Sequence, residues 1–147
     1  MNNLERTAIV TLAALVLASC GTVSRFQRVF RPAVCEDMTV SIYFQRDSAA
    51  ITPEARALLE GVGERAKGCL LGDVNVVGLA DAVGAADVNL ALSMKRAEAV
   101  KAAVVRAGFT TVVFQVGALG AAGALTDSGA ANPLHRRADV TFHMQPH

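Results

Sequence analysis

Two hydrophobic periodicities divide the chain into six segments. Residues 38–44 carry apolar side chains at every second position, as a strand with one buried face does, and residues 137–144 repeat that alternation. Short apolar runs over residues 74–79 and 111–116 predict two further strands. Between the first and second strands, and again between the second and third, apolar residues recur at helical spacing.

The first of the two predicted helices has clear end signals. Thr52 suits its N-cap, Pro53 its first position and the acidic Glu54 the positive end of the helix dipole, while Gly68 follows its last turn. The second helix is predicted over residues 89–107. The apolar positions at helical spacing are Ala55, Leu58, Leu59, Val62 and Ala66 in the first helix and Leu92, Ala97, Val100 and Val104 in the second.

The resulting order of elements is β-α-β-α-β-β. This order predicts an α+β fold, a two-layer sandwich in which both helices pack on one face of a mixed sheet. Residues 117–131 are rich in glycine and alanine and are predicted to form a long loop before the last strand. The chain has 147 residues, 52 % of them hydrophobic, which is enough for one domain with its own core, placed at residues 35–147.

The N-terminus carries an export signal. Residues 7–18 form an apolar run of signal-peptide length, too short for an ordinary transmembrane helix. The run leads into Leu-Ala-Ser-Cys at residues 17–20, which resembles the bacterial lipobox. We interpret residues 1–19 as a lipoprotein signal peptide that is cut before Cys20. The thiolate of Cys20 would then take up the lipid, whose acyl chains include palmitate. The residue after the lipidated cysteine is Gly21, which favours the outer membrane by the sorting rule of bacterial lipoproteins. The alternative is an ordinary signal peptide followed by a chance cysteine.

A short segment separates the predicted lipidation site from the domain. Residues 20–34 form this tether, and its residues 21–34 reach at most ~45–50 Å when fully extended. Three arginines in it, Arg25, Arg28 and Arg31, are interleaved with Phe26, Val29 and Phe30. The tether is either a basic amphipathic segment that lies on anionic headgroups or a plain solvated linker.

Cys35 and Cys69 are the two cysteines of the predicted domain. In an oxidising compartment such a pair favours a disulfide. Cys35 lies just before the first strand and Cys69 a few residues before the second, and a β-α-β crossover places the starts of two parallel strands at the same edge. Closing this 35-residue loop (69 − 35 + 1) would add roughly 3–4 kcal/mol by the chain-entropy model. The alternative is two free buried thiols.

A spaced set of residues surrounds the junction between the second strand and the second helix. It follows G-x-A-D-x-x-G-x4-N-x2-L-S-x2-R-A-x2-V from Gly78 to Val100, and N-x3-R-R-A-D-V follows from Asn132. These sets resemble the signature of the OmpA-like peptidoglycan-binding domain family over about residues 38–144. Together with the predicted lipid anchor, they are similar to its peptidoglycan-associated lipoprotein branch.

The resemblance implies a binding site for the peptidoglycan stem peptide. In the family, the residues matching Asp81 and Arg96 grip the free end of meso-diaminopimelate, and we assign Asn89, Leu92 and Phe44 to the same site. That free end is zwitterionic, so its ammonium needs an anionic acceptor and its carboxylate an arginine fork or backbone N–H groups. The alternative is an Asp81–Arg96 salt bridge that only pins the loop to the helix.

The chain departs from the family pattern at the end of its first strand, where Gln45 and Arg46 replace an acid and an aromatic residue. A later glycine-rich element of the signature also lacks its glutamate. Arg136 and Arg137 begin the last strand, and we expect a structural role for both, pairing with acids such as Asp139 or with the loop.

Charge and motif content exclude several other classes of function. The net charge of +1 argues against a dedicated nucleic-acid binder. No nucleophile or metal-binding motif points to an enzyme. His135, His143 and His147 lie near the C-terminus. The spacing of His143 and His147 would suit a metal site on a helix, but this segment alternates as a strand does. We therefore expect a non-enzymatic protein without metal or cofactor.

The resemblance implies an outer-membrane lipoprotein whose domain faces the periplasm. It would bind diaminopimelate-type peptidoglycan non-covalently and tether the membrane to the cell wall. The alternative is a periplasmic adaptor that docks a Tol-type or other envelope protein with weak or no wall binding, which the altered edge at Gln45 and Arg46 favours.

Overall fold

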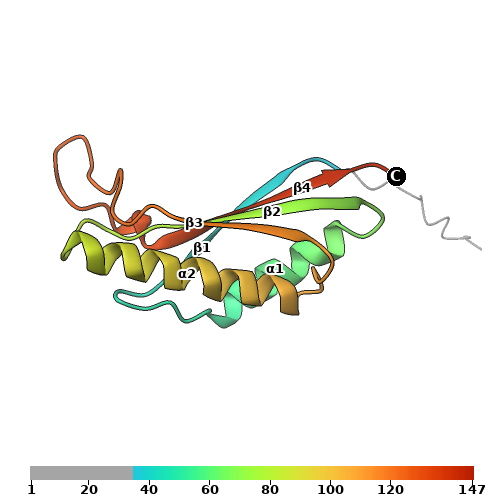
Figure 1. Cartoon of the computed structure of the whole chain (residues 1–147), viewed down its shortest axis with the longest axis horizontal. Helices are drawn as coiled ribbons and strands as arrows, with labels where there is room; N and C mark the ends of the chain where they lie inside the picture. The colour runs from blue at the N-terminus through green and yellow to red at the C-terminus, as the bar shows by residue number, and fades with distance from the viewer. Residues whose placement is uncertain (1–34) are drawn as a thin grey trace, which may run out of the picture. The chain divides into compact units, whose positions relative to one another are not determined.

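The elements follow the predicted order along the chain (Figure 1). The computed structural model describes residues 35–147, so the predicted signal peptide, Cys20 and the tether lie outside the described residues. The elements are β1 (Met38–Tyr43), α1 (Pro53–Arg65), β2 (Leu70–Gly78), α2 (Ala86–Arg106), β3 (Val113–Ala118), the 3-10 helix η1 (Pro133–His135) and β4 (Arg137–Gln145).

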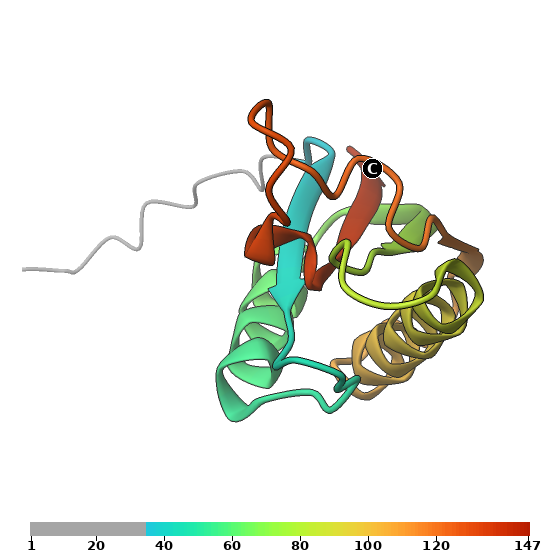
Figure 2. The ribbon, with the colours of Figure 1, turned by 90° about the vertical axis from the view of Figure 1, so that its left-hand side faces the viewer.

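The strands form one mixed sheet in the order β1-β4-β2-β3. Strand β4 is antiparallel to both β1 and β2, whereas β2 and β3 are parallel. Because β4 lies between them, β1 and β2 run in the same direction. Figure 2 shows both helices on the same side of the sheet, which confirms the predicted α+β two-layer fold.

The core fills the space between the sheet and the two helices. It is formed by alternate residues of the strands and by one stripe of each helix, including Ile42, Val74, Val76, Val140, Phe142, Leu59, Val62, Ala97, Val100 and Val104. The ring of Phe109 packs at 4.8 Å from that of Phe142. Leu58, one of the apolar positions at helical spacing in α1, is 44 % exposed and lies outside this core. It lies about 100° around the helix from Leu59, on whose side the buried stripe is centred.

The starts of three elements differ from the prediction because backbone hydrogen bonding, which side-chain periodicity does not report, decides them. Strand β2 begins at Leu70, four residues before its predicted start, with a register shift between Leu71 and Val74 that interrupts the alternation. Helix α2 begins at Ala86, three residues early. Strand β3 is displaced two residues toward the C-terminus, where it pairs with β2.

The start of α1 confirms its predicted signals. The Thr52 hydroxyl accepts a hydrogen bond from the Ala55 backbone N–H at 3.2 Å, and Pro53 is the first helical residue. The threonine satisfies one of the backbone donors that a helix start leaves without an intrahelical acceptor.

A disulfide joins Cys35 to Cys69, with 5.6 Å between their Cα atoms, and confirms the predicted pairing. The two cysteines meet because β1 and β2 run parallel on either side of β4, so both strands begin at the same end of the sheet. This end, where the tether would join the domain, is called the tether end below.

An exposed ion pair at the tether end gives a pH-dependent prediction. His143 Nδ1 lies 2.7 Å from Asp37 Oδ2, and Asp37 Oδ1 accepts the Met144 N–H at 3.1 Å. The hydrogen bond with Asp37 raises the pKa of His143, and the same bond, with that from Met144, lowers the pKa of Asp37. The stabilisation from His143 is therefore complete below its unfolded pKa, roughly 6.5, and is lost as pH rises through the higher folded pKa. That from Asp37 is lost as pH falls below about 4.

We expect the difference in melting temperature between wild type and His143→Ala to be greatest between about pH 4 and 6.5 and to shrink in alkaline buffer. Thermal unfolding across this pH range measures it, with Asp37→Asn and the double variant closing a mutant cycle. A difference that grows above neutral pH would contradict the assigned direction. The His143 and Asp37 side chains are 39 % and 57 % exposed, so salt should weaken the effect.

Candidate functional site

The candidate site lies where β2 ends and α2 begins, at the end of the sheet away from the disulfide (Figure 1). Asp81 follows the last residue of β2 by three positions. Two backbone hydrogen bonds hold the intervening segment: Leu79 N–H donates to Arg137 O at 2.8 Å, and Ala80 N–H donates to Gly120 O at 2.7 Å. The chain is thus fixed on both sides where it presents the aspartate.

Asp81 is 8 % exposed and pairs with an arginine. Its Oδ2 lies 3.2 Å from Nη1 of Arg136, and its Oδ1 accepts the Val83 N–H at 3.4 Å. Arg136 stands just before β4, 55 residues further along the chain. Its side chain is 25 % exposed, so the pair lies at the surface of the domain with the carboxylate largely covered.

Arg96 lies beneath the site and is completely buried. It donates to three backbone carbonyls: from Nε to Ser48 at 2.9 Å, from Nη1 to Leu79 at 2.8 Å and from Nη2 to Gln45 at 3.3 Å. Its guanidinium also lies over the Phe44 ring, 5.2 Å from the ring centroid. Burial lowers the pKa of Arg96, and the Asp81 carboxylate opposes that shift, so the group stays protonated.

The two predicted site residues Asp81 and Arg96 come to one place but do not form the salt bridge considered as an alternative. The carboxylate of Asp81 pairs with Arg136 instead, and Arg96 uses its donors on carbonyls. The sequence placed Arg136 in a structural role with an acid or the loop. Arg136 does pair with an acid, and that acid is Asp81. The contact brings Arg136 beside the candidate site, which local sequence did not indicate, although the N-x3-R-R pattern marked the residue. Arg137 pairs with Asp139 at 2.9 Å, as expected.

Helix α2 supplies the other assigned residues. Asn89 is 4 % exposed, and its Oδ1 lies 3.8 Å from where a side chain at Gly84 would begin, beside the loop that carries Asp81. Leu92 is partly exposed. Asn89, Leu92 and Arg96 are spaced by three and four residues, which places them on one face of the helix. Phe44 is 5 % exposed and belongs to the core under Arg96.

The turn that follows β1, where the chain departs from the family pattern at Gln45 and Arg46, covers Arg96. The carbonyls of Gln45 and Ser48 both accept from its guanidinium, and Asp47 between them has a left-handed backbone with φ of 52°. Only backbone atoms of this turn contact Arg96 by hydrogen bonding. The exchange of side chains at Gln45 and Arg46 is therefore compatible with the same turn geometry.

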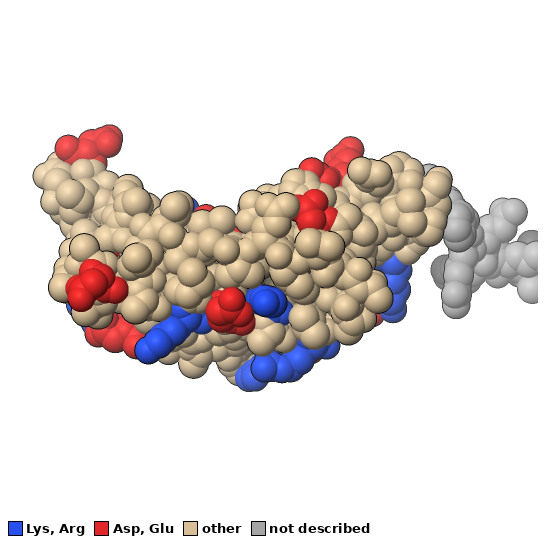
Figure 3. Space-filling view, in the orientation of Figure 1, with Lys and Arg blue, Asp and Glu red and all other residues tan. Residues whose placement is uncertain are grey.

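Buried charge separates this site from the rest of the surface. Figure 3 shows basic side chains gathered mainly along the helix side, with acidic ones among them and toward both ends of the molecule. Ion pairs there are exposed, as in Lys67–Glu64, where both side chains are about 70 % exposed. Exposed ion pairs of this kind contribute little to stability, whereas clusters of buried charged side chains are often found at functional sites.

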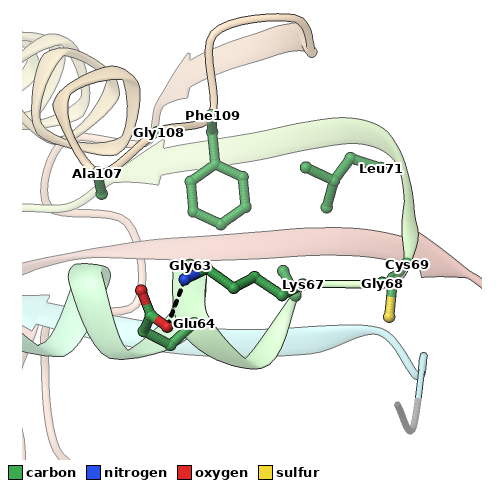
Figure 4. A pocket seen from close by; sticks show the side chains of 10 residues that line it. Gly63, Glu64, Lys67, Gly68, Cys69, Leu71, Ala107, Gly108 and Phe109 are labelled. Carbon is green, nitrogen blue, oxygen red and sulfur yellow. Dashed lines mark hydrogen bonds and ion pairs between the residues drawn. The ribbon is translucent and has the colours of Figure 1, made fainter. Parts of the chain in front are cut away.

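A cavity of 340 Å³ lies at the other end of the domain, between the C-terminal ends of the two helices (Figure 4). Phe109 and Leu71 line it together with the exposed Lys67–Glu64 pair. Because α2 spans 21 residues, or about 30 Å, this cavity is remote from Asp81. It holds none of the buried charges that distinguish the site at the end of β2.

The family model described as the OmpA family matches residues 43–137, which include Asp81, Arg96 and Arg136. The chain belongs to the OmpA family. The chain is 29 % identical over 108 residues to "Probable lipoprotein YiaD" of Escherichia coli, covering 72 % of this chain and 49 % of the relative. It is 36 % identical over 66 residues to outer membrane protein A of Bordetella avium, covering 45 % of this chain and 34 % of the relative. The chain thus spans half or less of the length of these curated relatives.

Solved OmpA-like structures agree with the fold. The peptidoglycan-associated lipoprotein of Burkholderia pseudomallei is 30 % identical, with a TM-score of 0.56 over 69 % of this chain and 88 % of that one. The cell wall anchor of the type VI secretion system of Pseudomonas aeruginosa is 20 % identical, with a TM-score of 0.56 over 75 % of this chain and 83 % of that one, and supports the fold alone. Within residues 35–147, no helix has both the length and the apolar character needed to cross a membrane.

Proposed function

We propose that this OmpA-family domain binds peptidoglycan non-covalently through the diaminopimelate of the stem peptide. The observation that carries the proposal is the covered Asp81–Arg136 pair at the end of β2, with the buried positive charge of Arg96 beneath it. The similarity to a peptidoglycan-associated lipoprotein supports the same ligand.

The site can complement both charges of a free amino-acid end. The ammonium of diaminopimelate would take the Asp81 carboxylate, which keeps acceptor capacity beyond its bond to Arg136. The carboxylate would take the partly exposed Arg136 and backbone N–H groups near the start of α2, where the helix dipole favours an anion. The ligand would thus insert itself into an existing ion pair, whose charges are already held in place.

Arg96 acts in this proposal mainly as a positioning residue. Its three bonds hold the carbonyls of Gln45, Ser48 and Leu79, and Leu79 is two residues from Asp81. The Asp81 carboxylate in turn favours the charged form of the buried Arg96. Three further residues complete the proposed site. Asn89 would support the loop that carries Asp81, Phe44 would support the guanidinium of Arg96, and Leu92 would form part of the rim of the site.

The proposal extends to the location of the protein. Residues 1–19 would be removed as a signal peptide, Cys20 would carry the lipid, and residues 20–34 would tether the domain to the outer membrane from the periplasmic side. The similarity to "Probable lipoprotein YiaD" and to an outer membrane protein supports an envelope location. The protein would then link membrane and wall by binding, without catalysis.

Binding to purified peptidoglycan sacculi tests the proposal. We expect wild-type domain to co-sediment with sacculi and Asp81→Asn to bind at least ~30-fold more weakly, because the ligand ammonium and Arg136 lose their shared anion, a loss of roughly 2–5 kcal/mol. Asp127→Asn removes the same charge from an exposed loop position and should bind like wild type. Free diaminopimelate-containing stem peptide should compete, whereas a lysine-containing one should not.

Equal binding by wild type and Asp81→Asn would refute the site, and equal competition by both stem peptides would refute the ligand. Absence of binding by the wild type would refute the function itself.

A docking role is the second candidate, because apolar side chains surround the same end of the domain. Val83, Leu119, Leu125 and Leu134 are each more than half exposed. An envelope protein, of Tol type or other, could cover them. Crosslinking in cells that gives one dominant protein partner and no wall-bound fraction would favour this adaptor role over wall binding.

A further inference from the structure

The disulfide and the proposed wall-binding residue stand at opposite ends of the same strand. Cys69 immediately precedes β2, and Asp81 follows its end by three residues. Figure 4 shows Cys69 where β2 begins, next to Leu71. Strand β2 is an inner strand, paired with β4 on one side and β3 on the other.

The disulfide shortens the covalent path between the tether and the site. Along the backbone, Cys35 and Asp81 are 46 residues apart (81 − 35), and through the bridge the path crosses to Cys69 and then runs 12 residues (81 − 69). Strand β1 and helix α1 both lie inside the ring that the disulfide closes, so neither belongs to this shorter path. A strand already extends ~3.3 Å per residue against a maximum of ~3.3–3.6 Å, so β2 offers little slack.

Strand β1 is poorly suited to receive tension from the tether. It is an edge strand that pairs only with β4, over six residues. A pull on Cys35 without the bridge would act on β1 first and then on the turn that covers Arg96. Through the bridge, the same pull reaches an inner strand whose far end is fixed by the bonds of Leu79 and Ala80.

We infer that the Cys35–Cys69 disulfide directs mechanical tension from the membrane anchor into β2, so that β1 and α1 stay out of the path between membrane and wall. The tension itself exists only if the domain tethers membrane to wall, so the biological use of this path rests on the proposed function. The device lets the site at Asp81 keep its geometry while the tether is pulled.

Single-molecule pulling of the mature chain tests the inference. Azide-bearing amino acids at Val34 and at Val83, which is 53 % exposed, would accept handles without adding a thiol. We expect wild type to yield at a higher force than Cys35→Ser/Cys69→Ser. When the variant yields fully, the 34 residues of the opened ring (69 − 35) should add about 110–120 Å of contour length.

Two further pulls keep the result interpretable. Handles at Val83 and His147 leave the bridge outside the path, so both proteins should yield at equal force. If the double variant does not fold, wild type pulled from Ala50 and Val83 replaces it, because force then enters between β1 and α1 and should unfold the protein at lower force than from Val34.

Equal yield force in wild type and variant from Val34, or equal force from Val34 and Ala50, would overturn the inference. Because the pull needs no peptidoglycan, such a result would leave the sacculus test of wall binding intact, and failure of wall binding would leave the measured force path intact.

Discussion

Replacing Arg96 with methionine is expected to lower the free energy of unfolding by about 3–5 kcal/mol and to abolish wall binding. The guanidinium is the shared donor of three carbonyls in two separate segments, those of Gln45 and Ser48 after β1 and that of Leu79 after β2. Methionine fills similar space but cannot donate, so these acceptors lose their partner, each at a cost of roughly 1–3 kcal/mol where it stays buried. The Asp81 carboxylate also loses a neighbouring positive charge.

Urea denaturation and sacculus binding measure the two effects separately. Lys95→Met is the matched control, because it makes the same kind of change one residue earlier on α2, at an exposed position. It should unfold and bind like wild type. If Arg96→Met were as stable as Lys95→Met, the three carbonyl bonds would contribute little to the fold.

A conservative replacement distinguishes positioning from general destabilisation. Arg96→Lys keeps the charge but cannot form the fork that reaches both segments at once. We expect it to recover part of the stability while binding to sacculi remains weak at temperatures where the variant is folded. Recovery of full binding would show that the charge alone, and not the placement of the turn, is what the site requires.

Gly78→Ala is expected to destabilise the domain by about 3 kcal/mol or more, with a fall in melting temperature of roughly 10 °C or more. A methyl group at this position would stand 1.9 Å from the carbonyl oxygen of Ser93 and 3.2 Å from the backbone N of Ala97. These are backbone atoms of α2, so relief requires the helix to move away from the strand. The glycine is needed because β2 and α2 approach here more closely than any side chain permits.

The displaced helix should also disturb the site. Ser93 is completely buried and its hydroxyl accepts the Gly120 N–H at 3.0 Å, while Gly120 O accepts from Ala80 beside Asp81. We therefore expect weaker wall binding by folded Gly78→Ala. Differential scanning calorimetry measures the stability.

Gly117→Ala gives the control for this experiment. Gly117 lies on the neighbouring strand β3, opposite Val77 of β2, and a methyl group at Gly117 would meet nothing within 4 Å. Its melting temperature should stay close to that of the wild type. Equal melting temperatures for the two alanine variants would contradict the close approach of β2 and α2.

Local patterns in the sequence were sufficient for much of the fold. Alternation and helical spacing predicted every main strand and both helices, since these periods follow from backbone geometry. Thr52 and Pro53 located the start of α1 because capping is a local interaction. The disulfide pairing also followed, because the crossover rule places the starts of parallel strands together whether or not another strand separates them.

What the sequence by itself determined was thus the order of elements, the family resemblance and the place of Asp81 between β2 and α2. Only the tertiary structure decided which strands are neighbours, with β4 between β1 and β2, and which charges meet. Arg136 reaches Asp81 across 55 residues, and Arg96 bonds to backbone carbonyls, which every residue has. Such contacts leave no periodic signature, because they depend on where the whole sheet brings distant segments together rather than on local sequence.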